Sequence, residues 1–144
     1  MRRTALVALL LLLPVLGARA QTASVSGPPM ELDAATVRRL NAAMTRDLRI
    51  LVTAQEQYFS EWAEYATDFQ RGAIKGAVLR PSAGVTVTLT YVTKQTYAAR
   101  ATHDWMPGRS CVMTVGRVAA SRIPVTTAEK RAPDKEAVPV CDAR

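Results

Sequence analysis

The residues that could do chemistry are few in this chain. His103 is its single histidine, so any histidine-dependent catalytic triad must use it. Asp104 follows directly, but adjacent residues of a strand point to opposite faces, so Asp104 is badly placed to orient the imidazole. We therefore interpret His103 as a histidine at the end of a strand, near the rim of a sheet.

Other candidate sites are equally sparse. Glu61 and Glu64 lie three residues apart on a predicted helix and could flank a sugar or a cation, although a solvated helix face is the simpler interpretation. The glycines are isolated, which does not fit a phosphate-binding loop. One histidine and two cysteines are too few ligands for zinc. We predict no catalytic residue, no metal site and no cofactor.

Trp105 stands in the Pro-Gly segment DWMPGRS. An aromatic residue on such a loop can be the tip of a binding surface, or it can fold back over the sheet edge. Both interpretations stay open. The loop from Trp105 to Arg109 is one candidate interaction surface.

The first twenty residues have the three parts of a secretory signal. Arg2 and Arg3 precede an apolar run of roughly 13 residues, shorter than the ~20 that a membrane-spanning helix needs. Cleavage is expected between Ala20 and Gln21, which places the chain in the periplasm or outside the cell. An uncleaved anchor is the alternative.

The predicted export favours a disulfide between the two cysteines, because an even number of cysteines in an exported chain is typical of disulfide bonding. A free thiol or a metal pair is the alternative. A bridge between Cys111 and Cys141 would close a loop of about 31 residues and stabilise the domain by roughly 3–4 kcal/mol.

The charge distribution argues against nucleic acid. Without Arg2, Arg3 and Arg19 the net charge falls from +7 to +4, and basic residues are spread over the rest of the chain with acidic residues between them. The chain has no basic stripe interleaved with aromatic residues, the pattern that single-stranded nucleic acid requires.

One long helix is predicted after a flexible lead-in at residues 21–32. Asp33 is a suitable N-cap, and apolar residues then recur every three or four positions up to about Tyr65. A helix of about 30 residues is about 45 Å long, which exceeds the width of one small domain. We expect its first half to project or to pack on a partner, with Val37, Leu40 and Met44 as a possible interaction surface.

The remainder predicts an antiparallel meander. Strict alternation from Val85 to Tyr91 indicates a half-buried strand, Thr96 to His103 a second, and Cys111 to Val118 a third. Residues 33–144 thus form one α+β domain: a long helix on a three- to four-stranded antiparallel sheet, with a tail closed by a disulfide. Five of the eight aromatic residues should anchor the end of the helix on the sheet: Tyr58, Phe59, Trp62, Tyr65 and Phe69.

This pattern resembles the globular domain of type IV pilins and pseudopilins. Three features carry the resemblance over Arg46–Asp142: the helix segment Leu48–Phe69, the strand opening Ser82–Thr90, and the Cys111 and Cys141 pair. The prepilin leader and the apolar half-helix that packs the filament core have no counterpart here. The resemblance therefore implies the fold but not polymerisation.

The function that we expect is that of an exported, non-catalytic, pilin-like module that binds a protein partner or associates with itself through the N-terminal helix. No nucleic acid is expected, and no stable membrane span if the signal is cleaved. The alternative is an atypical minor pilin or pseudopilin subunit of a type IV pilus or type II secretion system, anchored by an uncleaved N-terminal segment. An enzyme is the third possibility.

Overall fold

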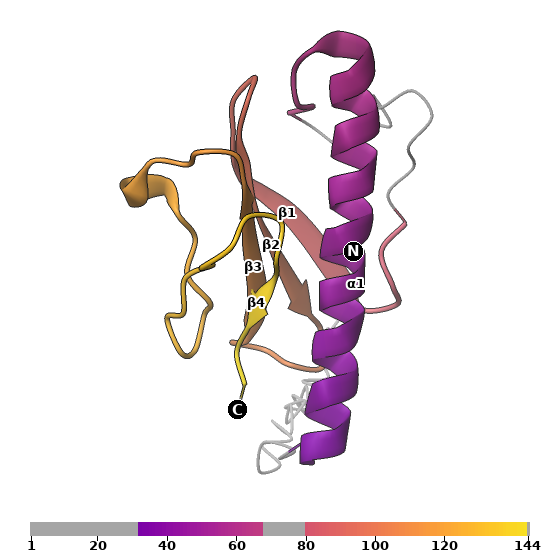
Figure 1. Cartoon of the computed structure of the whole chain (residues 1–144). Coiled ribbons are helices and arrows are strands. Elements are labelled where there is room, and N and C mark those ends of the chain that lie inside the picture. The colour runs from indigo at the N-terminus through magenta and orange to yellow at the C-terminus, as the bar shows by residue number, and fades with distance from the viewer. Residues whose placement is uncertain (1–31, 68–79, 144) are drawn as a thin grey trace, which may run out of the picture. The chain divides into compact units, whose positions relative to one another are not determined.

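The computed structural model describes residues 32–67 and 80–143. The predicted signal with Ala20 and Gln21, most of the lead-in, and Phe69 lie outside these ranges. In the described part, the helix α1 (Ala34–Trp62) packs on a four-stranded antiparallel sheet (Figure 1). The predicted α+β class is confirmed.

The start of α1 follows from its cap. The Asp33 carboxylate accepts hydrogen bonds from the backbone N–H groups of Ala35 and Thr36, at 2.8 and 2.9 Å, which satisfies donors that the first turn leaves free. The helix ends at Trp62, earlier than the predicted Tyr65, because Ala63 adopts a left-handed conformation with φ +54°. The Ala63 N–H closes the last turn on the Phe59 carbonyl at 2.8 Å.

The first half of α1 does not project, and this expectation is wrong. Val37, Leu40 and Met44 are 6, 5 and 0% exposed and belong to the hydrophobic core. This half of the helix packs on the sheet, in one core cluster with Val85 and Ala101. The end of the chain also lies beside it, where the Asn41 side chain donates to the Asp142 carbonyl at 2.8 Å. These three apolar side chains are therefore core residues rather than an exposed interaction surface.

The aromatic anchor is smaller than predicted. Tyr65 is buried and lies edge-on to the buried Tyr97 ring, with centroids 4.8 Å apart, and Phe59 packs against Tyr65 at the same distance. Tyr58 is half-buried, whereas Trp62 is 54% exposed and contacts Tyr58 on the outside of the helix. Trp62 therefore does not anchor the helix, because the helical stripe leaves the core after Gln55.

The chain beyond the helix is held by a buried side chain. Gln55 is fully buried, and its amide both donates to the Ala66 carbonyl and accepts from the Ala66 N–H, each at 2.9 Å. The Tyr65 hydroxyl donates to Glu56 at 2.9 Å. Burial, and then this hydrogen bond to a carboxylate, raise the pKa of Tyr65 to about 12. These contacts turn the chain back over the sheet.

The sheet is a meander in which each strand pairs with the next. The third strand ends before the predicted Val118, since Gly116 turns the chain at φ +72° and has no room for a Cβ beside the Gln95 carbonyl. The strands are β1 (Val85–Val92), β2 (Tyr97–His103), β3 (Ser110–Val115) and β4 (Val140–Cys141).

A bulge changes which side chains of β1 face the helix. The register shifts between Leu89 and Tyr91. A shift of one residue moves the side chains of the residues that follow to the opposite face of the sheet. Val92 packs against the core, and Tyr91 instead lies beneath the Arg122 guanidinium, 5.8 Å from the ring centroid. The strict alternation predicted from Val85 to Tyr91 is therefore wrong at Tyr91.

The segment between β3 and β4 covers the face of the sheet opposite α1 (Figure 1). Ala98 and Val112 are fully buried there, and Arg100 donates to the Val125 carbonyl at 3.1 Å. The predicted disulfide is present, and its cysteines are direct partners in the β3–β4 register. Both faces of the sheet are therefore covered, one by α1 and the other by this segment.

Candidate functional site

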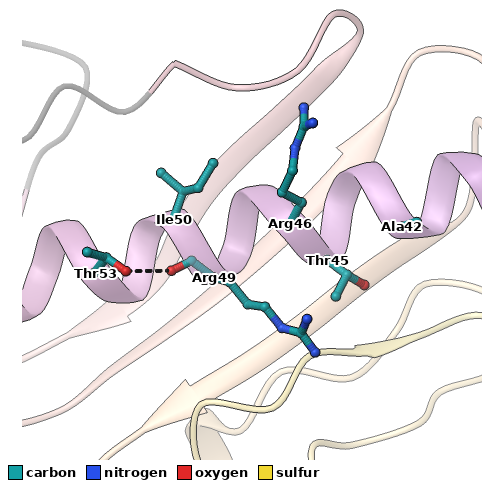
Figure 2. Close-up of a pocket in the computed structure, with 6 residues that line it drawn as sticks. All are labelled: Ala42, Thr45, Arg46, Arg49, Ile50 and Thr53. Atoms are coloured by element: carbon teal, nitrogen blue, oxygen red, sulfur yellow. Dashed lines mark hydrogen bonds between the residues drawn. The ribbon is translucent and has the colours of Figure 1, made fainter.

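A hollow lies on the outward face of α1, and the described residues that line it all belong to that helix. Its volume is about 380 Å³. Figure 2 shows that Arg46 and Ile50 point to one side of the helix and Arg49 to the other, while Thr53 donates back to the Arg49 carbonyl at 3.4 Å. Ligand sites need polar groups that converge, and these diverge. We do not assign a site here.

A second hollow lies where three elements meet. Its volume is about 480 Å³, within the range of roughly 300–1,000 Å³ that is common for small-ligand sites. We call it the Trp105 cavity. It is lined by α1, by the turn before β1 and by the end of β2, through Arg39, Leu40, Ala43, Ala83, Gly84, His103, Asp104 and Trp105.

A buried carboxylate fixes one wall of this cavity. Asp47 is 1% exposed and accepts from Ser82 through both the backbone N–H, at 2.6 Å, and the hydroxyl, at 2.8 Å. Arg46 approaches the same carboxylate at 3.6 Å and also donates to the Ser82 hydroxyl. The segment that carries Ala83 and Gly84 is thereby fastened to the helix, next to the turn that bears Arg39.

The Trp105 loop is held by its own backbone. The Trp105 N–H donates to His103 Nδ1 at 3.1 Å, the Met106 N–H donates to the His103 carbonyl at 2.9 Å, and the Asp104 N–H donates to the Gly84 carbonyl at 2.9 Å. Met106 is buried in the core. The Trp105 side chain is nevertheless 66% exposed. Its ring centroid is 5.9 Å from that of His103 at the end of β2, so Trp105 lies at the sheet edge while most of its surface stays exposed.

His103 is seated on a glycine at the floor of the cavity. The side chain is 6% exposed, and a Cβ at position 84 would lie 2.8 Å from its Cε1 atom. Gly84 also has φ +77°, where any other residue is strained. Because Nδ1 accepts from Trp105, the neutral imidazole carries its proton on Nε2. Within residues 32–67 and 80–143, no group accepts a hydrogen bond from Nε2.

Arg39 and Asp104 supply opposite charges at the mouth. Both side chains are exposed, and within the described ranges neither forms an ion pair. The cavity therefore offers two donors, the Arg39 guanidinium and His103 Nε2, one acceptor carboxylate and a flat indole. This set can hydrogen-bond a polar ligand while an apolar face lies on the ring.

The structure also places the other residues singled out in the sequence. His103 ends β2 at the rim, as predicted, and Asp104 makes no hydrogen bond to its ring. Arg109 is half-buried and does not line the cavity. Glu61 is exposed, and Glu64 pairs with Lys94 at 3.3 Å, so the two do not form a site. Among the described residues there is no group of three metal-ligating side chains.

Sequence reasoning identified Trp105 but missed its neighbours. Arg39, Ala83 and Gly84 are remote from Trp105 along the chain and meet it only through the packing of α1 on the sheet. The one usable signal was Gly84, an isolated glycine directly before a strand, which is typical of a position that a neighbouring group approaches closely.

No helix in the described ranges combines the length and the apolar content that a bilayer crossing requires. No family model matches the chain, and no curated protein matches its sequence.

Proposed function

We propose that this protein is an exported, non-catalytic binding module and that the Trp105 cavity is its contact surface. The observation that carries the proposal is an indole 66% exposed on a loop whose backbone is tied to the core, beside a hollow with polar walls. An aromatic side chain on a backbone that is already ordered loses little entropy on binding, and tryptophan is enriched at the energetic centres of interfaces. The signal pattern and the disulfide support export.

The hydrogen bonding of His103 favours binding over catalysis as the role of the cavity. Its Nδ1 is engaged by the Trp105 N–H, and the adjacent carboxylate does not orient the ring. A general base needs both a free nitrogen directed at substrate and a partner that sets its tautomer. Here the backbone sets the tautomer, and the remaining nitrogen is a donor.

Kinship with pilins and pseudopilins remains part of the proposal. A helix on an antiparallel sheet, with a disulfide that fastens the tail, supports it. The alternative role is that of an atypical minor subunit anchored by an uncleaved N-terminal segment. The intact mass of protein isolated from cells separates the two, because a chain that begins at Gln21 has lost the segment that would anchor it.

Replacement of Trp105 tests the contact surface. We expect immobilised, oxidised Trp105→Ala to retain roughly 30-fold less envelope material than wild type, because truncation of a central tryptophan costs about 2 kcal/mol or more of binding free energy. Trp62→Ala is the matched control, since Trp62 is also exposed but lies at the end of α1. Quantitative retention at several protein densities is the measurement.

Both variants should melt within a few degrees of wild type, because exposed side chains contribute little to stability. Equal retention by Trp105→Ala and wild type would show that the cavity is not the contact surface.

A further inference from the structure

We propose that the Trp105 cavity binds a saccharide ring. This rests on the proposed function, because it names the ligand class of the same surface. The indole supplies one half of the recognition. A pyranose presents a face of C–H groups that is flat and apolar, while its hydroxyl groups lie around the edge. An exposed tryptophan ring that is held in place offers the matching plate.

The polar walls supply the other half. Arg39 and the Nε2 atom of His103 donate, and Asp104 accepts. A sugar hydroxyl both donates and accepts, so hydroxyl groups of a saccharide are chemically complementary to each of the three residues. An anion would meet the Asp104 carboxylate, and a cation would meet Arg39. The mixed charge of the walls therefore favours a neutral ligand rich in hydroxyl groups.

Burial of His103 argues against a wholly apolar ligand. The imidazole is 6% exposed, and its Nε2–H is without an acceptor in the described part of the chain. A hydrocarbon placed over it would strip its water and supply no hydrogen bond, which opposes binding. A hydroxyl group removes that conflict. The donor is aligned in advance, because Gly84 and the Trp105 N–H fix the ring.

The ligand class can be tested by fluorescence with the exported, oxidised chain. Trp62→Phe leaves Trp105 as its one tryptophan. We expect saturable changes in its emission on titration with the trimer of N-acetylglucosamine or with maltotriose. In this background, Arg39→Gln and Asp104→Asn should each weaken the affinity about tenfold, since hydrogen bonds to charged groups are the stronger ones. Arg49→Gln, on the same helix but outside the cavity, is the matched control and should change nothing.

Several outcomes would overturn the ligand class. One is the absence of a saturable response to either sugar. Another is a response to sodium acetate or phosphate that weakens with added salt, which identifies an anion site. The envelope material that wild type retains gives an independent arm. A saccharide ligand survives protease and is lost after periodate, which cleaves vicinal diols.

The opposite pattern, loss after protease but not after periodate, rejects the saccharide. Retention that still depends on Trp105 would then leave the contact surface standing. Loss of that dependence would reject the proposed function itself.

Discussion

At the scale of single residues, a few buried polar side chains hold this fold together. Asp142 is fully buried, and its carboxylate accepts from the backbone N–H groups of Ser110 at 2.8 Å, Ala128 at 3.2 Å and Glu129 at 2.7 Å. Its own N–H donates to the Ser110 carbonyl at 3.1 Å. One residue thereby joins the start of β3, the tail loop and, through Asn41, the helix.

The pKa of Asp142 has two opposing causes. Burial raises it, while hydrogen bonds from Glu129, Thr126, Ser110 and Ala128 lower it, and together they leave the pKa below its usual value of 3.8. The folded state therefore favours the carboxylate. Its contribution to stability is present above the unfolded pKa and is lost as the pH falls through the folded pKa.

Asp142→Asn should lower the free energy of unfolding on the order of 2 kcal/mol at pH 7, because the amide cannot accept all the hydrogen bonds that the carboxylate accepts. The difference in the free energy of unfolding between the two proteins should narrow as the pH falls through the usual carboxyl pKa of 3.8 and then through the lower pKa of the folded state, because the wild-type carboxylate takes up its proton. Urea unfolding at several pH values measures this. A deficit that is the same at all pH values would show that ionisation of Asp142 does not stabilise the fold.

At the scale of elements, α1 has two faces with different roles. Its inward stripe from Val37 to Gln55 is buried against the sheet and the tail. Its outward face carries arginines and the partly exposed Ile50. The stripe predicted as an interaction surface is core, and the contact surface proposed above uses α1 only through the turn around Arg39.

Met44→Ala tests this packing. We expect a loss of about 2–5 kcal/mol in the free energy of unfolding, because a fully buried side chain leaves a cavity. Ile50→Ala on the same helix should cost less than about 1 kcal/mol, since Ile50 is 39% exposed. Equal losses, measured by chemical unfolding, would contradict the orientation of the helix.

At the scale of the whole chain, the disulfide joins the tail to the centre of the domain. Cys111 is fully buried in β3, and Thr45 of the helix lies 3.4 Å from the Cys141 sulfur. The two-residue strand β4 has few ladder contacts of its own, so the covalent link secures the segment that covers the first half of α1.

Cys111→Ser with Cys141→Ser should lower the free energy of unfolding by roughly 3–4 kcal/mol, because the bridge closes a separation of 30 residues in the unfolded chain. Reductant should destabilise wild type by a similar amount and leave the double variant unchanged. Thermal melts with and without dithiothreitol test this. A wild type that is insensitive to complete reduction would contradict it.

The sequence by itself determined the order and kind of the elements. Helical and alternating periodicities are local properties, so the residue pattern alone predicts α1, the antiparallel strands and the Asp33 cap. The disulfide was predicted from the even number of cysteines and from the predicted export of the chain. Residues 1–31 and 68–79 lie outside the described ranges, and the signal remains a prediction.

Only the tertiary structure decided which segments cover each face of the helix and of the sheet. The bulge before Tyr91, the tail beside Asn41 and the outward position of Trp62 depend on contacts between segments far apart in the chain, and periodicity does not encode such contacts. The Trp105 cavity has the same origin. The sequence shows an aromatic residue on a loop, but Arg39 and Gly84 reach it only because a helix, a turn and a strand end pack together.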